Sequence, residues 1–419
     1  MLGVLWRHGP VTRNFLASSL RLNPAIISSL VRSLQDRGLV VKIGNASSTG
    51  GRKADLIDVA PNLRTVIGVE FSSRGIFIAS ADLRGGLRHK SQASFSRSDS
   101  PDVLLDKISA MVGEQIRVLE EQGTPRERML IGFALSGTVD QVNGVSVGFP
   151  RMEHWSNVPL RELIERRFGV RTTVGSHMHG ATVAEHLFGN AQGATDALFV
   201  QAGPGIGLGM VLNGRVYRGF HGLGGEFGHT QMLDNGPLCY CGARGCLESL
   251  ASDEAVLTRA RKGLDNGVNS DLQVFNRRPG GLTPADVFEA ARDGDRFALN
   301  IVEEVGYYLG VGIANLINLM APEVIVLGGT MLSCSDLLQE VISRTVSSKV
   351  LRHLKDHVVI RSSAFGAEAG LRGAITLAAL EFFDSEPGGQ AAPGVLEKAD
   401  IGGDERFAAL RESEGTLAV

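Results

Sequence analysis

Three of the four cysteines in this chain lie within eight residues, in the segment LCYCGARGCLES. His229 precedes Cys239, Cys241 and Cys246 by ten or more positions on the same glycine-rich stretch. Three thiolates and one imidazole form the soft, closed donor set that is typical of a structural Zn²⁺ site. Such an ion would fix the whole stretch in one conformation. The alternative is that the three cysteines are buried free thiols.

The bulk composition is that of an ordinary globular protein with several domains, since 43% of the 419 residues are hydrophobic and 21% are charged. Four cysteines in a chain of this length exclude a disulfide scaffold. No apolar stretch approaches the roughly 18–20 residues that cross a bilayer. The start, MLGVLWRHGPVTRN, does not have the layout of a signal peptide. We therefore expect a cytoplasmic protein without a membrane partner.

The charge is unevenly distributed along the chain. Residues 1–60 contain eight Lys and Arg against three acidic residues, although the whole chain has a net charge of −3. A basic head on an acidic body is typical of proteins that bind nucleic acids.

The same 60 residues have the pattern of two helices joined by a tight turn. Asn23 is a favourable N-cap, Pro24 suits the first helical position, and Gly38 ends the second helix. Helical spacing predicts a buried stripe on this helix, formed by Ile26, Ile27, Leu30, Val31 and Leu34. The opposite face carries Ala25, Ser28, Ser29 and Arg32.

The segment LVVKIGNASSTGGRKADLIDVA then alternates on both sides of a glycine-rich tip, which predicts a β-hairpin wing. Residues 1–60 are thus expected to form a winged helix-turn-helix domain. Its helix would place Ala25, Ser28, Ser29 and Arg32 towards the major groove of double-stranded DNA. Its wing would place Arg52 and Lys53 on phosphates or in the minor groove. The alternative is a protein-interaction module with a solvated basic face.

The rest of the chain alternates between strand and helix patterns, as α/β proteins do, with a loop expected over 138–158. We predict a first α/β lobe over 61–175, completed by about 372–384, and a second lobe over 176–371. Residues 385–419 are polar and rich in Gly and Pro, so a disordered tail is expected there.

The segment GLGGEFGHTQMLDNGPLCYCGARGCLES resembles the sugar-and-zinc segment of the ROK family, which comprises bacterial sugar kinases and sugar-responsive repressors. The resemblance, together with the winged helix, points to the regulator branch. It implies a two-lobed, actin-like or ribonuclease H-like sugar-kinase fold. It also implies that Glu226, His229 and Glu248 bind sugar hydroxyls, with His229 also a zinc ligand. The loop ALSGTVD resembles the turn near the sugar, which adds Ser136 and Gly137.

Two departures from the family pattern concern phosphoryl transfer. Family kinases carry a phosphate-binding Asp-x-Gly-Gly-Thr turn, where this chain reads VEFSSRGIF from Val69, so the turn Glu70–Gly75 lacks the glycine pair. The catalytic aspartate of the kinases aligns with His177. Phosphoryl transfer depends mainly on positioning and charge stabilisation, so we expect this chain not to be an enzyme.

The segment TVGSHMHG replaces the family's Asn-Asp-x-Asn, and this raises the question of what its histidines do. One interpretation is that Ser176, His177 and His179 line a modified effector pocket and donate hydrogen bonds, for example to a sugar phosphate or a sugar acid. A second is that the histidines are neutral and packed at a strand end. A third is another metal site, although no carboxylate or thiolate is near in sequence.

These observations predict a DNA-binding transcriptional regulator of the repressor type. A sugar or sugar derivative would bind between its two lobes, and a structural Zn²⁺ would hold the cysteine loop. The resemblance implies a homodimer or a dimer of dimers, with the segment VGYYLGVGIANLINLM as a candidate surface unless that helix is core. The rival function is an ATP-dependent sugar kinase with an appended DNA-binding domain. A third is a zinc-stabilised interaction protein that has lost its ligand.

Overall fold

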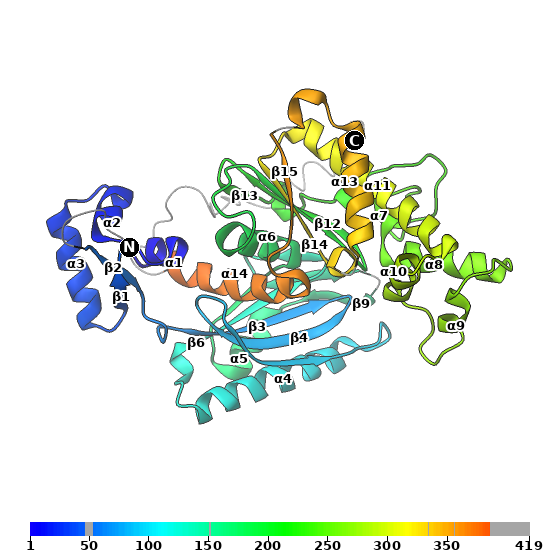
Figure 1. The fold of residues 1–419 in the computed structure, drawn as a ribbon. Helices are drawn as coiled ribbons and strands as arrows, with labels where there is room; N and C mark the ends of the chain where they lie inside the picture. Colours follow the sequence, from blue (N-terminus) through cyan, green and yellow to red (C-terminus); the bar gives the residue numbers. More distant parts are fainter. Residues whose placement is uncertain (47–52, 151, 334, 356, 386–419) are drawn as a thin grey trace, which may run out of the picture.

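The N-terminal head consists of three short helices and a hairpin (Figure 1). The computed structural model describes residues 1–46, 53–150, 152–333, 335–355 and 357–385. The elements of the head are α1 (Leu2–His8), α2 (Arg13–Leu20), α3 (Pro24–Asp36), β1 (Val40–Asn45) and β2 (Asp55–Val59). The two strands pair antiparallel, as expected of a wing.

Two predicted features lie outside the described residues: the tip with Arg52, and residues 386–419 of the expected tail. Ser385, the first residue of that expected tail, ends the last helix.

The caps of α3 form as the sequence predicts, but its buried stripe is narrower than predicted. The Asn23 side chain accepts a hydrogen bond from the Ala25 backbone N–H at 2.8 Å. Ile27 and Val31 are fully buried, whereas Ile26 and Leu30 are 49% and 40% exposed, so their predicted burial is wrong. The five residues of the stripe span an arc of about 140°, and α2 and β1 cover only one side of it.

The first lobe is built on a five-stranded mixed sheet in the order β10-β6-β3-β4-β5. Its strands are β3 (Thr65–Ser72), β4 (Gly75–Asp82), β5 (Leu87–Ala93), β6 (Met129–Leu135) and β10 (Thr172–Ser176). Helices α4 (Pro101–Glu121) and α5 (Leu160–Phe168) bury their apolar faces against one side of the sheet. Ser100 caps α4 by accepting from the Val103 backbone N–H, as its place before Pro101 predicts.

The loop expected over 138–158 is instead a small antiparallel sheet, so that prediction is wrong. It contains β7 (Thr138–Asp140), β8 (Val145–Phe149) and β9 (Met152–Val158). Its strands are short, and shifts in pairing register at Thr138/Val139 and Gly148/Phe149 break the alternation that would otherwise identify them.

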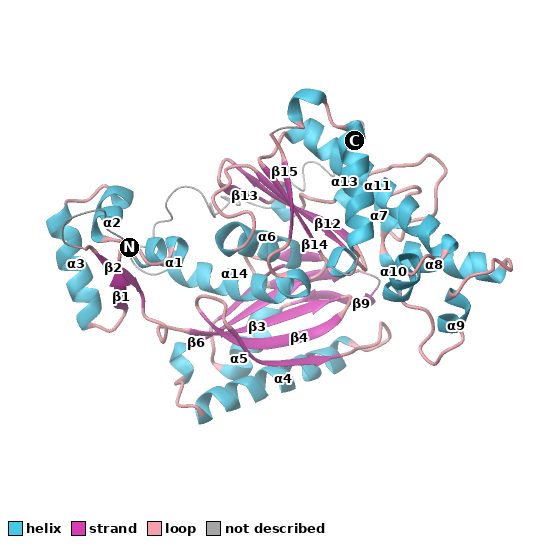
Figure 2. Ribbon diagram, in the orientation of Figure 1, coloured by secondary structure: helices cyan, strands magenta, loops and turns pink. Residues whose placement is uncertain are grey.

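The second lobe has another five-stranded mixed sheet, in the order β13-β12-β11-β14-β15 (Figure 2). Its strands are β11 (Ala197–Ala202), β12 (Ile206–Leu212), β13 (Arg215–Tyr217), β14 (Val324–Gly328) and β15 (Val359–Ser362). The helices of this lobe are α7 (Leu247–Ala251), α8 (Asp253–Asp265), α9 (Leu272–Asn276), α10 (Pro284–Arg292), α11 (Arg296–Met320), α12 (Thr330–Ser333) and α13 (Asp336–Lys349). Helix α11, which contains the candidate dimer surface, lies mostly in the core and exposes Tyr307 and Leu319.

Two helices, α6 (His177–Phe188) and α14 (Ala369–Ser385), lie between the two sheets (Figures 1 and 2). Helix α6 contacts β11 and β12, and α14 contacts β3, β6 and β10. The two helices cross with their backbones in contact, because a Cβ atom on Gly373 would lie 2.5 Å from the Gly180 carbonyl carbon. Only glycine at this crossing allows so close an approach.

The head is attached to the C-terminal end of α14. The Trp6 indole N–H donates to the Leu83 carbonyl at 2.6 Å, and its ring stacks on Phe383 at 5.2 Å. Arg7 forms an ion pair with Asp384 at 3.0 Å. Helix α14 therefore contacts the N-terminal head at one end and the interior of the body along its length.

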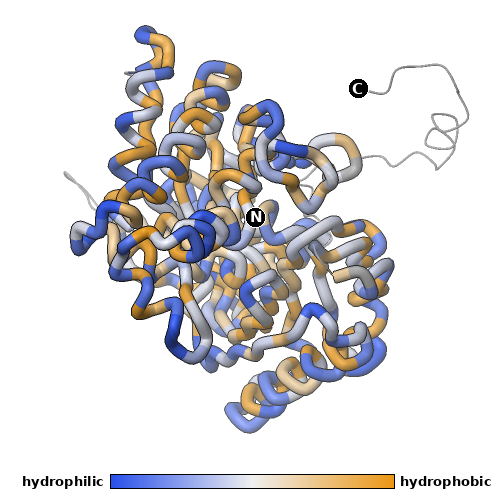
Figure 3. Tube along the Cα trace, turned by 90° about the vertical axis from the view of Figure 1, so that its right-hand side faces the viewer, coloured by the Kyte–Doolittle hydropathy of each residue, from blue (hydrophilic) through white to orange (hydrophobic). Residues whose placement is uncertain are grey.

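Hydrophobic and hydrophilic residues are interleaved along the chain (Figure 3). Among the described helices, none combines the length and the apolar character needed to traverse a bilayer.

The packing of α14 on the first sheet provides a test of the fold. A Cβ atom on Gly132 of β6 would lie 2.0 Å from the Ala374 carbonyl oxygen. We expect Gly132→Ala to destabilise the protein by about 1–3 kcal/mol, because the helix must shift. The measurement is the urea midpoint of unfolding followed by circular dichroism. Gly148→Ala is the control, since no atom lies within 4 Å of its Cβ position, and an equal effect of both changes would contradict this packing.

Candidate functional site

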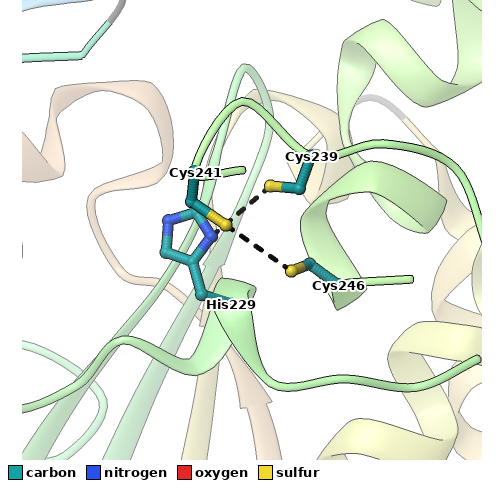
Figure 4. A group of neighbouring side chains, drawn as sticks. All are labelled: His229, Cys239, Cys241 and Cys246. Carbon is teal, nitrogen blue, oxygen red and sulfur yellow. Dashed lines mark hydrogen bonds between the residues drawn. The ribbon is translucent and has the colours of Figure 1, made fainter. Parts of the chain in front are cut away.

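The predicted zinc ligands lie together on the loop between β13 and α7 (Figure 4). The donor atoms of His229, Cys239, Cys241 and Cys246 all lie within 4.8 Å of one another. His229 Nδ1 is 3.6 Å from Cys239 Sγ, and the Sγ atoms of Cys241 and Cys246 are 3.8 Å apart. The histidine comes from the end of η3 (Phe227–His229), and Cys246 immediately precedes α7.

These separations fit a tetrahedral ion. With Zn–S bonds of about 2.3 Å and a Zn–N bond of about 2.0–2.1 Å, a regular tetrahedron places two sulfurs about 3.8 Å apart and nitrogen about 3.5 Å from sulfur. Four protein donors leave no open position, as in structural rather than catalytic zinc sites.

Neighbouring groups orient the ligands and set their protonation. The Tyr240 hydroxyl lies 3.1 Å from His229 Nε2, which holds the ring with Nδ1 towards the sulfurs. Burial raises the pKa of Cys239 and raises that of Cys246 to about 12, while a backbone hydrogen bond from Ala243 lowers the pKa of Cys241. A metal ion would therefore have to displace protons from the two buried thiols.

The two glutamates expected at the sugar differ in environment. Glu248, in the first turn of α7, is 6% exposed, and one carboxylate oxygen accepts from the Ile206 backbone N–H at 2.9 Å. The Glu226 side chain is 71% exposed, and its carboxylate lies 4.0 Å from His229 Nε2. Glu248 thus supports the start of β12, and Glu226 is open to solvent beside the zinc ligand.

His177 forms the centre of a buried polar chain. Its Nε2 lies 3.0 Å from the Gln201 amide oxygen on β11, and its Nδ1 lies 3.7 Å from a Glu70 carboxylate oxygen on β3. Gly370 at the start of α14 packs against both residues, since its Cβ would lie 2.2 Å from His177 Cε1. His177 therefore connects the two sheets.

The turn Glu70–Gly75, where the family kinases hold phosphate, is occupied by an internal ion pair. The Arg74 guanidinium donates to Glu70 Oε1 at 2.7 Å and to the Ala367 carbonyl at 2.8 Å. The Ser72 hydroxyl donates to the same Glu70 oxygen at 2.8 Å. Glu70 is 1% exposed, so the turn holds a buried carboxylate together with its cation.

His179 makes a second connection between the lobes. Arg218 Nε, after β13, donates to His179 Nε2 at 3.1 Å, and the Gln141 side-chain amide lies 2.9 Å from Nδ1. Arginine can only donate, so His179 Nε2 accepts and the neutral ring carries its proton on Nδ1. The Gln141 atom at 2.9 Å from Nδ1 is the amide nitrogen, and turning this amide over would place its oxygen there as the acceptor. Burial, followed by the Arg218 charge, holds the pKa of His179 well below its usual value, so the ring is neutral.

The remaining residues expected at the effector lie at strand ends. Ser136 follows β6 and is half-buried, and Gly137 is exposed with φ +91°. A Cβ atom on Gly137 would lie 2.2 Å from the Gly148 carbonyl oxygen, so this turn requires glycine. Ser176 is the half-buried N-cap of α6, and its side chain makes no cap hydrogen bond.

On the head, Ala25, Ser29, Arg32 and Lys53 are exposed. Ser28 is half-buried and donates to the Pro24 carbonyl at 2.9 Å. Within the described residues, four basic residues of the head form no ion pair and remain available to phosphate: Arg21, Arg32, Arg37 and Lys53. By contrast, Arg13 and Lys42 share an ion pair with the single carboxylate of Asp55, at 3.1 and 2.5 Å.

Sequence reasoning missed the partners of the two histidines. Gln201, Gln141 and Arg218 are distant in sequence from α6, and no pattern in the chain marks them. Arg74 was detectable in principle, because i and i+4 opposite charges in a tight turn can reach one another.

Comparisons with known proteins identify the family and the fold. The ROK family is matched over residues 66–381. The chain is 31% identical over 374 residues to the DNA-binding transcriptional dual regulator NagC of Escherichia coli K12, covering 87% of this chain and 89% of that protein. It is 26% identical over 339 residues to the xylose repressor of Caldicellulosiruptor bescii, covering 81% and 84%.

Two crystal structures show the same fold. One is a ROK family transcriptional regulator described as a homolog of the Escherichia coli MLC protein, with 26% identity, a TM-score of 0.75, and coverage of 90% of this chain and 93% of that one. The other is a ROK family glucokinase from Streptomyces griseus in complex with glucose and AMPPNP, with 26% identity, a TM-score of 0.66, and coverage of 75% and 99%. These similarities confirm the expected α/β fold class.

The metal cluster can be tested by changing one ligand. We expect Cys241→Ser to lose most of the bound zinc and to lower the melting temperature, because three donors bind the ion far more weakly than four. Zinc per chain is measured by inductively coupled plasma mass spectrometry. Leu238→Ser is the matched control, since Leu238 lies in the same loop and is 66% exposed. Full zinc occupancy in Cys241→Ser would exclude this ligand set.

Proposed function

Because this chain belongs to the ROK family, we propose that it is a DNA-binding transcriptional repressor controlled by a sugar or sugar derivative. The relatives reported above are named as regulators or repressors of transcription, and one carries the name of xylose. Such a protein works in the cytoplasm, where its operator DNA is found.

DNA binding is assigned to the head. The exposed face of α3 offers small side chains at Ala25 and Ser29 and a cation at Arg32, which suits entry into a major groove. The wing would add Lys53 and Arg52 on the flanking backbone. We further propose that a homodimer reads a near-palindromic operator, because a two-fold protein pairs with a two-fold site.

The observation that carries the regulator assignment over the kinase alternative is the Glu70–Arg74 pair. A nucleotide phosphate at this turn would meet a buried carboxylate, 1% exposed, whose cation is already engaged. At the position of the catalytic base, His177 is held between Gln201 and Glu70. The two parts of the machinery that phosphoryl transfer needs are thus used for internal contacts.

The effector is assigned to the junction of the lobes, near Glu226, His229, Glu248, Ser136 and Gly137. Ser176, His177 and His179 flank this junction at the start of α6. A ligand that favours one degree of closure would alter the contacts that His177 and His179 make to both sheets. Helix α14 would carry this change to the head, since Gly370 touches His177 and Asp384 holds Arg7.

We propose that the ion bound by His229, Cys239, Cys241 and Cys246 is a structural Zn²⁺. It would hold in one conformation the loop that carries Glu226 and the start of α7 with Glu248. Loss of the metal should therefore weaken the effector response together with stability.

The kinase alternative is tested by ATP consumption. We expect no sugar-dependent ADP formation by the purified protein with glucose, xylose, N-acetylglucosamine or N-acetylmannosamine, because the phosphate turn is blocked. A coupled assay with a heat-inactivated control measures this. Turnover that rises with the concentration of any one sugar would overturn the regulator-only assignment.

The DNA-binding face is tested at Arg32. We expect Arg32→Ala to weaken binding to DNA selected by the wild-type protein from a random pool. If Arg32 contacts a phosphate, the negative slope of log association constant against log salt concentration should become shallower by about 1. Fluorescence anisotropy over a salt series measures both. Arg277→Ala, an exposed arginine of the second lobe, is the control. Unchanged affinity in Arg32→Ala would contradict the placement of α3.

A further inference from the structure

Arg218 carries a positive charge that no described carboxylate neutralises. It is half-buried, and burial lowers the pKa of its guanidinium only to about 10, so it remains a cation at neutral pH. The one polar contact of this guanidinium with the described residues is the hydrogen bond from Nε to His179. The two terminal nitrogens of the guanidinium therefore have no protein acceptor in that part of the chain.

Three other shielded arginines among the described residues are paired with carboxylates. Arg7 binds Asp384, Arg74 binds Glu70, and Arg84 binds Asp58. An unpaired cation away from water is costly, because desolvation is not offset by an opposite charge. The contrast indicates that the partner of Arg218 is supplied from outside the chain.

The surroundings of Arg218 orient its guanidinium rather than neutralise it. Neutral His179 accepts the Nε–H, and the Gln141 side-chain amide contacts the other ring nitrogen from the other lobe. With Nε held, the two terminal nitrogens form a planar fork that suits the two oxygens of a carboxylate or phosphate. Arg218 also directly precedes the segment that carries Glu226 and His229.

We propose that Arg218 binds an acidic group of the effector, so that the effector is a phosphorylated sugar or a sugar acid rather than a neutral sugar. This rests on the proposed function, because it specifies the chemistry of the same ligand. The acidic group lies against Arg218, and the hydroxyl groups lie towards Glu226 and His229. Binding then brings a charge to the place where Gln141 and Arg218 both contact His179 from the two lobes.

The test is isothermal titration of the zinc-loaded protein with three neutral sugars and their acidic derivatives. The neutral sugars are glucose, xylose and N-acetylglucosamine. The acidic set is glucose 6-phosphate, N-acetylglucosamine 6-phosphate, gluconate and xylonate, which separates phosphate from carboxylate recognition. We expect at least one acid to bind at least about tenfold more tightly than its neutral parent.

The variant Arg218→Met should weaken binding of that acid by about 10- to 100-fold and weaken binding of the neutral parent by a much smaller factor. Arg218→Lys should keep part of the preference, because it retains the charge without the fork. Arg277→Met is the matched control. The melting temperature of ligand-free Arg218→Met should change little, because removal of a half-buried unpaired charge offsets the lost hydrogen bond to His179. Inorganic phosphate alone should not reproduce the tight binding.

Three results would overturn the inference: no acid binds at millimolar concentration, acids bind no better than their neutral parents, or the preference survives in Arg218→Met. Failure of the proposed function is separately visible. If a neutral sugar releases the selected DNA and no acid does, the repressor assignment stands and the inference fails. If the protein binds no DNA, or no sugar or derivative changes DNA binding, the proposed function itself fails.

Discussion

The crossing of α6 and α14 is the contact on which the rest of the structure depends. The two helices touch backbone to backbone at Gly180 and Gly373, between the sheets of the two lobes. At this separation neither helix can move without the other, because interiors this dense transmit displacement. Helix α14 has 17 residues, which is a length of about 25 Å, so a shift at His177 and Gly370 reaches Trp6 and Arg7 through one rigid element.

The sequence predicted the parts of the protein that are local. The N-cap of α3, the hairpin wing and the four metal donors each depend on neighbours within about twenty residues, and the structure brings them together. The burial of the apolar stripe of α3 was overestimated. Helical spacing tells which residues share a face of the helix, but not how much of that face other elements cover. The sheet β7-β8-β9 was missed, since its strands are short and its register shifts hide the alternation.

The contacts of the histidines on α6 were not predictable in the same way. His177 meets Glu70 and Gln201, and His179 meets Gln141 and Arg218, over separations of more than 20 residues. Whether these rings would bind a ligand, a metal or the protein itself depends on which strand ends the topology places beside them. That information lies in the packing of two lobes, which no periodicity in one segment encodes.

The turn Glu70–Gly75 suggests how a sugar-kinase scaffold could serve in regulation. In a kinase the phosphate turn must remain open for the nucleotide, so closure of the lobes depends on that ligand. Here Arg74 and Glu70 occupy the turn permanently, and Arg74 also ties it to the segment before α14 through the Ala367 carbonyl. On the proposed function, closure would depend on the effector bound near His179 and Glu226, and a ligand acting on α6 and α14 would alter the position of the head.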